Sequence, residues 1–318
     1  MNSSFKKLSS VIKKAKSIAI FTHINQDEDA LGSSVSLGLA LKKIGKNAKV
    51  FICDKFTDAQ EAIFKKDIIS FSSCEPNEFD LMISTDVPSK QRMGKYAEVF
   101  CNFNNTIMLD HHTTVDLNPT YYYVDTLSSS CSELSYMLIK AMKIKIDKEI
   151  ATYIYAGLSS DTSSFINSNV NESSFAVALE LLKAGADTTK VNEKLYRMKS
   201  KKEVELTKYL WNNYVIKKDC AYCVVSFDTL KQLKAKKTDC DSFSRELVSI
   251  SGVNMSFSLV EIERGLFSLS MRALSGFDVR SIAAKLGGGG HLCASGAKFT
   301  AKDIDEAKDM VLKAVFSK

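Results

Sequence analysis

The sequence predicts an α/β protein of two domains. Its 318 residues, 45% hydrophobic and 25% charged, are enough to form two separate cores. Up to residue 188, short apolar runs alternate with helical patterns, which indicates βαβ units and a parallel sheet flanked by helices. Residues 219–318 have the alternation of strands in a smaller α/β domain, and the charged, mostly helical segment 189–218 is expected to connect the two.

Apolar periodicity places the elements of the first domain. Phe5, Leu8, Ile12 and Ala15 recur at helical spacing, so the chain is expected to begin with an amphipathic helix. Strands are expected at residues 17–22, 50–53, 79–85 and 106–109. Helices are expected at residues 30–44, 131–144, 148–159 and 172–184.

The second domain is expected to combine three strands with two helices. The strands are residues 221–227, 253–262 and 266–272, and the helices are residues 278–286 and 301–316. Arg264-Gly265 joins the last two strands as a tight hairpin turn. The glycine run 287–290 follows the first of the two helices and is expected to be a loop.

Charge and composition exclude several classes of protein. The net charge of +6, from 43 basic and 37 acidic residues, fits anionic ligands but is too weak to indicate binding to duplex nucleic acid. The apolar run 17–21 is too short for a secretory signal, and no stretch approaches the ~18 residues of a membrane span, so a cytoplasmic protein is expected. Cys220 and Cys223 form a C-x-x-C without a second pair, which favours buried thiols over zinc.

Histidine is scarce, and each of the four histidines lies beside aspartates or glycines. His23 follows a predicted strand, and Asp27 and Asp29 come within the next six positions, before a predicted helix. Ligands of open α/β folds bind at this carboxyl edge of the sheet, and divalent ions accept mixed imidazole and carboxylate ligands. One aspartate can also cap the helix, but a cap does not need three such residues.

Three further positions follow predicted elements in the same way. Asp86 ends the strand 79–85 and Asp161 follows the helix 148–159, where each alone is typical of a cap or turn. Asp110-His111-His112 comes directly after the strand 106–109. Asp110 can fix the orientation of an adjacent ligating imidazole.

Together these clusters predict a centre for two divalent ions. The expected ligands are His23, His111, Asp27, Asp29, Asp86 and Asp161. Two imidazoles and four carboxylates suit two ions about 3.5–4 Å apart that bind a water between them for attack on phosphorus. The imidazoles favour Mn²⁺, with Mg²⁺ or Co²⁺ as substitutes.

The glycine run before His291 can bind phosphate. Glycines allow close backbone approach, and their N–H groups can donate to phosphate oxygens. Arg272 and His291 can add charge or hydrogen bonds. The run lacks the Lys-Ser/Thr of a nucleoside-triphosphate loop, and a flexible turn is the alternative interpretation.

These motifs resemble the DHH phosphoesterase family. The family signature is matched by Asp110-His111-His112, and its first motif by His23-x-Asn25-x-Asp27-x-Asp29-Ala30-x-Gly32-Ser33. The second motif is similar to Asp86 with Arg92-x-Gly94, and the fourth to the run from Gly157 through Asp161-Thr162 and Phe165. The phosphate-binding loop of the DHH-associated C-terminal domain resembles Gly288-Gly289-Gly290-His291 followed by Ala294-x-Gly296.

The resemblance implies roles for the matching residues. One manganese would be held by His23 and Asp27, and the other by Asp29 and His111. Asp86 would bridge the two ions, and Asp161 would complete the set. His112 and Asp110 would act in catalysis, with His112 at the scissile phosphate or the leaving group. The substrate would lie in a cleft between the domains, held by Arg92, Arg272, Gly288, Gly289, Gly290 and His291.

Length and the C-terminal domain resemble one branch of the family, the oligoribonucleases (nanoRNases) that also dephosphorylate 3′-phosphoadenosine 5′-phosphate. The implied partners are therefore short nucleic acids or nucleotides, with no membrane, and a homodimer is left open. The alternatives are an inorganic pyrophosphatase or exopolyphosphatase, a linear-dinucleotide phosphodiesterase, and a nucleotide sensor without activity. Four residues depart from the family pattern: Gln26, Glu28, Ser163 and Ser295.

Overall fold

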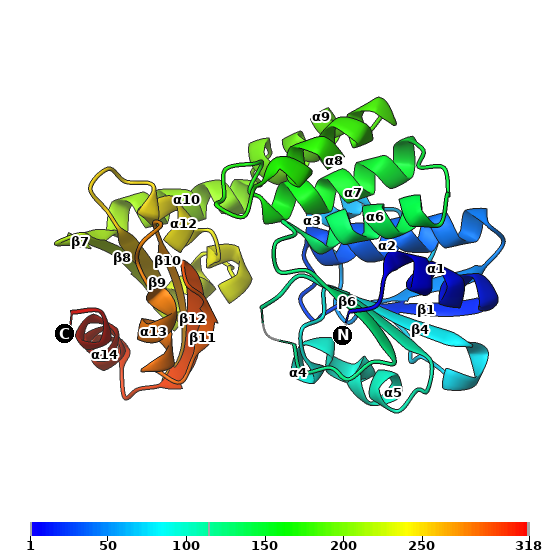
Figure 1. The fold of residues 1–318 in the computed structure, drawn as a ribbon. Coiled ribbons are helices and arrows are strands. Elements are labelled where there is room, and N and C mark those ends of the chain that lie inside the picture. Colours follow the sequence, from blue (N-terminus) through cyan, green and yellow to red (C-terminus); the bar gives the residue numbers. More distant parts are fainter. Residues whose placement is uncertain (1, 114, 317–318) are drawn as a thin grey trace. The chain divides into compact units, whose positions relative to one another are not determined.

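The computed structural model describes residues 2–113 and 115–316 and contains two compact units. One unit ends at Met198 and the other begins at Lys199. The division therefore falls inside the segment 189–218 that was expected to connect two domains. Figure 1 shows a helix-covered sheet in each unit.

The sheet of the N-terminal unit is parallel throughout, with strand order β3-β2-β1-β4-β5-β6. Its strands are β1 (Ser17–Phe21), β2 (Asn47–Phe51), β3 (Ile69–Ser70), β4 (Leu81–Thr85), β5 (Thr106–Asp110) and β6 (Tyr121–Val124). The chain moves outward from β1 to β3 and then returns to place β4 on the other side of β1. The strand order thus reverses between β1 and β4, which is where open α/β sheets bind ligands.

Helices cover both faces of this sheet (Figure 1). The helices of this unit are α1 (Phe5–Lys14), α2 (Glu28–Lys43), α3 (Asp58–Ile63), α4 (Lys90–Met93), α5 (Ala97–Cys101), α6 (Cys131–Ala141), α7 (Lys148–Asp161), α8 (Glu172–Lys183) and α9 (Thr188–Asn192). Short turns of other helix types lie at η1 (Pro76–Glu78), η2 (Gly94–Tyr96) and η3 (Glu193–Arg197). Alternate residues of β1 separate two cores: Ile18 and Ile20 pack with α1, α2 and α6, whereas Phe21 packs with the aromatic side chains of η2 and α5.

The expected elements of this unit are present, with shifted ends. Helix α2 begins at Glu28 rather than residue 30, because the Asp27 side chain accepts hydrogen bonds from two backbone N–H groups of its first turn. Strand β2 begins at Asn47 and ends at Phe51, earlier than expected, and helix α7 runs on to include Asp161. Strands β3 and β6 and helices α3 to α5 were not predicted, because such short elements carry little periodicity.

The sheet of the C-terminal unit is mixed, with strand order β11-β12-β10-β9-β8-β7. Its strands are β7 (Val215–Lys217), β8 (Cys220–Val225), β9 (Met255–Glu263), β10 (Leu266–Ala273), β11 (Gly289–His291) and β12 (Ala294–Thr300). Its helices are α10 (Lys201–Asn213), α11 (Phe227–Gln232), η4 (Lys237–Cys240), α12 (Phe243–Val248), α13 (Val279–Ala284) and α14 (Ile304–Phe316). One face packs on α13 and α14, and the other on α10, α11 and α12.

Two expectations for the C-terminal unit need correction. The strand expected at 221–227 ends at Val225, because the Ser226 side chain caps helix α11 and so draws Phe227 into the helix. The glycine run is not a loop throughout. Gly289–His291 forms the edge strand β11, which pairs antiparallel with β12. The hairpin expected at Arg264-Gly265 is present between β9 and β10, with Gly265 at a φ of +76°.

Candidate metal centre and phosphate-binding residues

Three adjacent strands deliver side chains to one point at the carboxyl edge of the N-terminal sheet. Phe21, Ser84 and Met108 lie on one rung of β1, β4 and β5. His23 and Asp86 each follow that rung by two residues, and the Asp110-His111-His112 run begins at the same distance beyond it. The parallel register therefore aligns the three motifs that the sequence singled out.

Asp86 lies between two imidazoles. Its Oδ2 is 3.5 Å from the His23 Nε2, and its Oδ1 is 3.4 Å from the His111 Nε2. The side chain is almost fully buried, and Oδ1 has no hydrogen-bond partner among the described residues. A buried carboxylate oxygen without a donor, facing an imidazole nitrogen, fits a cation shared between the two sides.

Asp27 joins the side of the centre that contains His23. One of its carboxylate oxygens is 3.7 Å from the His23 Nε2. The same oxygen accepts hydrogen bonds from the backbone N–H groups of Asp29 and Ala30. Asp27 is thus both the cap of α2 and a neighbour of His23. A helix cap and an expected metal ligand are therefore compatible interpretations of this residue.

Asp29 and Asp161 lie on the other side, with His111. The His111 Nε2 is 3.9 Å from Asp29 and 3.5 Å from Asp161. Asp29 is held at the start of α6, where it accepts hydrogen bonds from the backbone N–H groups of Cys131 (2.6 Å) and Ser132 (2.8 Å). The six expected ligands therefore lie close together in groups that could each hold a metal ion. His23, Asp27 and Asp86 form one group, and Asp29, His111 and Asp161 form another. A third group joins Asp86 and His111 to His112.

Two glycines permit the close helix packing behind Asp29. A Cβ on Gly157 of α7 would lie 1.9 Å from the Ser132 Oγ and 2.8 Å from the Asp29 Oδ1. A Cβ on Gly32 of α2 would lie 2.6 Å from the Tyr153 carbonyl oxygen. Glycine is needed at both positions, because the three helices that carry or hold Asp29 approach each other too closely for a side chain.

Asp110 orients His112, not His111. Its Oδ1 accepts a hydrogen bond from the His112 backbone N–H at 2.7 Å and lies 2.8 Å from the His112 Nδ1. The His111 Nδ1 lies instead 3.3 Å from the Ser128 carbonyl oxygen. The two neighbouring histidines are therefore oriented by different groups. Asp110 contacts the Nδ1 of His112 and not its Nε2.

The carboxylates and imidazoles shift one another's pKa values. Burial and the nearby Asp86 raise the pKa of Asp29 to about 7, and burial with Asp29 close by also raises the pKa of Asp161. Burial opposes ionisation of Asp86, but His111 and His23 outweigh it and lower its pKa. Burial would lower the pKa of His23, yet its carboxylate neighbours raise it to about 10. Four carboxylates beside two imidazoles form an anionic cluster that a cation stabilises.

Arg92 contacts the centre from behind His23. Its guanidinium Nη2 is 2.9 Å from the His23 Nδ1, on the opposite side of the ring from Asp27 and Asp86. The same Nδ1 is 2.8 Å from the Ile24 carbonyl oxygen. Arg92 therefore lies next to an expected ligand.

Two of the departures from the family pattern form a network beside the centre. The Ser160 hydroxyl donates to the Glu28 carboxylate at 3.2 Å, and the Gln60 side chain donates to the Gln26 carbonyl oxygen at 2.9 Å. Burial, together with Asp27, raises the pKa of Glu28. The extra carboxylate is thus tied to α7 at the residue before Asp161.

In the C-terminal unit, the expected phosphate-binding residues share one rung. Arg272 of β10 pairs with Ala294 of β12, which pairs with His291 of β11. Directly paired residues of antiparallel strands point to the same side, so Arg272 and His291 lie on one face. Gly288 and Gly290 are required sterically, since a Cβ would lie 2.1 Å from the Gly296 carbonyl oxygen and 2.6 Å from the Ala294 carbonyl oxygen, respectively.

Sequence reasoning did not predict Arg245, whose charge acts on Arg272 in the folded unit. Ser256 of β9 is the other rung partner of Arg272, and its hydroxyl donates to the Ser244 carbonyl oxygen at 2.5 Å. Burial and then the Arg245 charge lower the pKa of Arg272. Among the described residues neither arginine makes an ion pair with a carboxylate, and a lone arginine in α12 carries no motif that could have revealed it.

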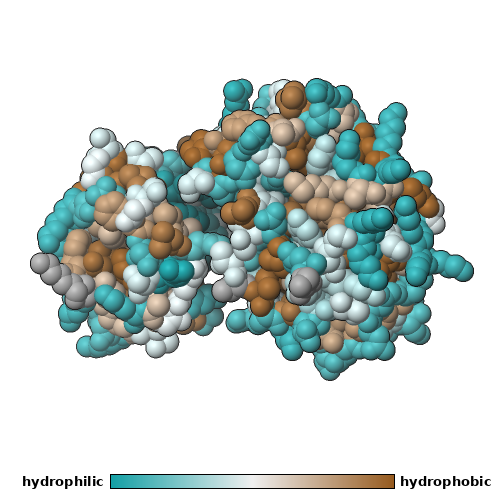
Figure 2. Space-filling model, in the orientation of Figure 1, coloured by the Kyte–Doolittle hydropathy of each residue, from teal (hydrophilic) through white to brown (hydrophobic). Residues whose placement is uncertain are grey.

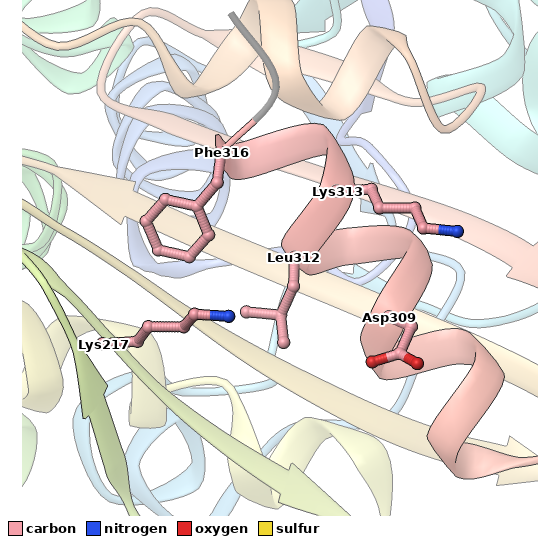
Figure 3. Close-up of a pocket in the computed structure, with 5 residues that line it drawn as sticks. All are labelled: Lys217, Asp309, Leu312, Lys313 and Phe316. Atoms are coloured by element: carbon pink, nitrogen blue, oxygen red, sulfur yellow. The ribbon is translucent and has the colours of Figure 1, made fainter.

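A separate pocket lies elsewhere in this unit. It has a volume of about 480 Å³ and is lined by Lys217 of β7 and by Asp309, Leu312, Lys313 and Phe316 of α14 (Figure 3). The Lys217 ammonium lies 5.3 Å from the centre of the Phe316 ring. None of the expected site residues lines it, so it stands apart from the Arg272 face.

The fold and the six clustered side chains define a doubly wound α/β domain with a candidate metal centre of aspartates and histidines, joined to a smaller sheet domain. Comparison with known families agrees. Residues 17–158 match the DHH family, N-terminal domain, and residues 217–316 match the DHHA1 domain. The chain therefore contains a DHH N-terminal domain followed by a DHHA1 domain.

Curated relatives match over most of the chain. The "Bifunctional oligoribonuclease and PAP phosphatase NrnA" of Mycoplasma genitalium is 27% identical, over 96% of this chain and 96% of the relative. The protein of the same name from Thermus thermophilus is 28% identical, over 94% of this chain and 89% of the relative.

A solved structure, an exopolyphosphatase-related protein from Bacteroides fragilis, is 27% identical with a TM-score of 0.91, covering 98% of this chain and 95% of that one. This similarity and the family matches establish the α/β fold with a second, smaller domain.

The helices in the part of the chain that the structure describes include no candidate membrane span. None of its helices is both long enough and apolar enough to cross a membrane. On the face shown in Figure 2, hydrophilic side chains predominate and hydrophobic ones form smaller patches.

Proposed function

We propose that this chain is a metal-dependent phosphoesterase that hydrolyses short oligonucleotides and 3′-phosphoadenosine 5′-phosphate. The observation that carries the proposal is the buried Asp86 carboxylate between the His23 and His111 imidazoles, with one oxygen lacking a hydrogen-bond donor. A centre shared by two groups of ligands is the arrangement that phosphoesterases with two metal ions use.

The proposed ligands divide into two sets around Asp86. His23 and Asp27 form one set, and Asp29, His111 and Asp161 form the other. Two Mn²⁺ ions bound there would supply an activated water and positive charge for the phosphoryl oxygens. The two imidazoles support Mn²⁺ over Mg²⁺, which prefers oxygen ligands and retained waters.

His112 is proposed to act on the scissile phosphate or its leaving group. His112 lies beside the centre, with its Nδ1 3.6 Å from the Asp86 Oδ1. The proposed ligand His111 is instead oriented through its own Nδ1, which contacts the Ser128 carbonyl oxygen. Asp110 holds the Nδ1 side of His112, which directs the Nε2 away from that carboxylate. An imidazole held in one orientation beside the centre can donate a hydrogen bond to a phosphoryl oxygen or a proton to a leaving oxygen.

The C-terminal unit is proposed to hold a phosphate of the substrate away from the scissile bond. Arg272 and His291 share one face of the sheet, and the glycines at 288–290 open the backbone beside them. Arg245 adds a second guanidinium. Two arginines without a carboxylate partner fit a phosphate, whose oxygens accept paired hydrogen bonds from a guanidinium.

The names of the curated relatives support nucleotides as substrates, since those proteins are named oligoribonuclease and 3′-phosphoadenosine 5′-phosphate phosphatase. The name of the Bacteroides fragilis protein, exopolyphosphatase-related, favours the second candidate, hydrolysis of inorganic pyrophosphate or polyphosphate. Both candidates use the same metal centre and differ in whether a nucleoside is recognised.

One assay separates the candidates. Phosphate and mononucleotide release in Mn²⁺ would be compared for 3′-phosphoadenosine 5′-phosphate, a linear dinucleotide, a five-residue RNA and pyrophosphate. Turnover of the nucleotides with pyrophosphate inert supports the proposal and orders the substrates. Fast hydrolysis of pyrophosphate with nucleotides untouched would reject it in favour of the second candidate.

A further inference from the structure

Glu133 is a buried carboxylate that is not among the proposed metal ligands. It lies in the first turn of α6 and is 1% exposed. Its Oε2 accepts hydrogen bonds from the Ser129 N–H at 3.2 Å and from the Ser129 hydroxyl at 2.8 Å, and its Oε1 accepts one from the Ser173 hydroxyl of α8. None of these donors carries a charge. Because burying a carboxylate without hydrogen bonds is unfavourable, the three donors indicate a position built around this side chain.

Through these contacts Glu133 fixes the segment 128–132, which precedes it in the chain. The Ser129 hydroxyl also accepts a hydrogen bond from the Ser174 hydroxyl at 3.0 Å, so the first turn of α8 holds the segment as well. The Ser130 hydroxyl accepts one from the Glu133 N–H at 3.1 Å. The segment is therefore tied to both α6 and α8 by hydrogen bonds that meet at Ser129 and Glu133.

The segment 128–132 directly contacts two members of one candidate ligand group. That group consists of Asp29, His111 and Asp161. The Ser128 carbonyl oxygen is 3.3 Å from the His111 Nδ1. The first two backbone N–H groups of α6 donate to the Asp29 carboxylate. A shift of this segment would therefore move the group that orients an imidazole together with the two donors that hold a carboxylate.

The third member, Asp161, is linked to the same segment through Asn169. The Asn169 Nδ2 donates to the Ser129 carbonyl oxygen at 2.9 Å and to the Asp161 carbonyl oxygen at 3.3 Å. Asp161 is the last residue of α7, where a carbonyl oxygen has no hydrogen-bond partner within the helix. Ser129, whose N–H and hydroxyl are held by Glu133, thus also ties down the end of α7.

A second candidate ligand group is oriented by different contacts. It consists of His23, Asp27 and Asp86. The His23 Nδ1 lies against the Arg92 guanidinium and the Ile24 carbonyl oxygen, and Asp27 caps α2. The Asp86 N–H donates to a carbonyl oxygen of β5. None of these contacts involves the segment 128–132.

We propose that Glu133 is a positioning residue for one metal ion. It fixes the segment 128–132 and so sets how tightly Asp29, His111 and Asp161 bind their ion, while the other ion is unaffected. Residues that orient metal ligands typically contribute about 10–100-fold to metal affinity. The inference rests on the metal centre of the proposed function, but its test needs no substrate.

Titration of metal-free protein with Mn²⁺, followed by electron paramagnetic resonance, tests the proposal. The wild type is expected to bind two ions. In Glu133→Ala, one ion is expected to bind about 10–100-fold more weakly and the other as in the wild type. Glu133→Gln keeps an oxygen for Ser129, and the Ser173 hydroxyl can accept from its amide, so most of the affinity should return. Two ions bound by Glu133→Ala as tightly as by the wild type, or both weakened alike, would overturn the proposal.

Two further variants separate positioning from a general loss of stability. Ile12→Ala removes a fully buried side chain from α1, which carries no proposed ligand, and is expected to lower the melting temperature without weakening either ion. Ser129→Ala removes one donor to Glu133 and is expected to weaken the same ion about three- to tenfold, the equivalent of one hydrogen bond.

Ser129→Ala decides the question if circular dichroism shows that Glu133→Ala does not fold. Unchanged affinity for both ions in Ser129→Ala would then overturn the positioning role and leave the proposed function intact. A wild type that binds fewer than two ions would instead reject the metal centre itself, and this inference with it.

Discussion

Asp86 occupies the position with the strictest structural requirements in the proposed metal centre. It is the first residue after the buried strand β4, it has a φ of 61°, and its N–H donates to the Leu109 carbonyl oxygen of β5 at 3.0 Å. This turn points the carboxylate between His23 and His111. An aspartate tolerates that backbone conformation better than most residues, so geometry and chemistry select the same side chain.

Replacing this residue tests the shared centre. Asp86→Ala is expected to lower phosphoesterase turnover by more than about 1,000-fold, beyond the 10–100-fold typical of residues that only support a ligand. Bound metal, measured after gel filtration, should fall with it, because both ligand sets lose a member. An Asp86→Ala protein that retained both metal and wild-type turnover would show that the residue is not a ligand.

Asp110 and His112 allow a contrasting test. Asp110→Asn removes the charge that orients His112 but none of the six proposed ligands. Turnover is expected to fall about 10–100-fold while the metal content stays at the wild-type level. Loss of metal in this variant would mean that Asp110 supports the metal centre directly.

For single residues, the sequence was most informative about the histidines, because the chain contains few of them. Four histidines in 318 residues made the clusters at His23 and His111 stand out. Adjacency could not say which histidine Asp110 holds, because that depends on how the chain turns after β5. Arg245 was not predicted, because its proposed role depends on its effect on Arg272, which is distant in the sequence.

The elements position the centre through their ends and their spacing. Strands β1, β4 and β5 end at one edge, α2 starts there, and α7 ends there. The buried apolar runs of those strands were predicted from the sequence, whereas β3, β6, β7, β11 and β12 were not. Strand β7 lies in the segment 189–218, which was expected to be mostly helical. Short edge strands, or strands rich in glycine and small polar residues, lack the alternation on which such a prediction depends.

The close packing of α7 on α2 and α6 gives an element-scale prediction. Gly157→Ala places a methyl group against the Ser132 hydroxyl and the Asp29 carboxylate, so the helices must separate. We expect weaker metal binding and a loss of about 1–3 kcal/mol in the free energy of unfolding. Gly185→Ala is a control, because its Cβ would only make an ordinary contact with the Lys148 side chain at 3.8 Å, although its φ of +88° adds local strain. Equal metal affinity in Gly157→Ala and the wild type would contradict the packing argument.

The start of α7 gives a second prediction, with a pH dependence. Asp147 caps α7 and pairs with Lys43; burial opposes its ionisation, but these contacts outweigh it and lower its pKa. A lowered folded-state pKa means that the charge stabilises the fold above the unfolded value of 3.8, and that this contribution is lost as the pH falls below it.

Two variants of Asp147 separate the cap from the charge. Asp147→Ala is expected to cost about 1 kcal/mol of unfolding free energy at neutral pH, and Asp147→Asn less, because asparagine also caps helices. Urea denaturation at pH 7 and pH 3 measures both. A difference between the wild type and Asp147→Asn that grew toward acid pH would contradict the sign of the shift.

At the scale of the whole molecule, the two units have separate tasks in the proposal. The N-terminal unit carries the metal centre, and the C-terminal unit carries the Arg272 face. Their fold class was predicted from composition and alternation.

Variants in the C-terminal unit test this division. Arg272→Ala and Arg245→Ala are expected to raise KM for 3′-phosphoadenosine 5′-phosphate by about 10–100-fold, corresponding to a lost charge-assisted hydrogen bond, with a smaller effect on kcat. Lys298→Ala, on the same sheet, is the control. A kcat loss without a change in KM would place these arginines in the chemical step instead of in substrate binding.

The most direct test of a metal-dependent phosphoesterase is phosphate release from 3′-phosphoadenosine 5′-phosphate by chelator-treated protein, before and after Mn²⁺ is added. The account predicts no release in the absence of metal and recovery that saturates at two equivalents of Mn²⁺ per chain. Release at the full rate in the presence of chelator, or none at any Mn²⁺ concentration, would contradict it.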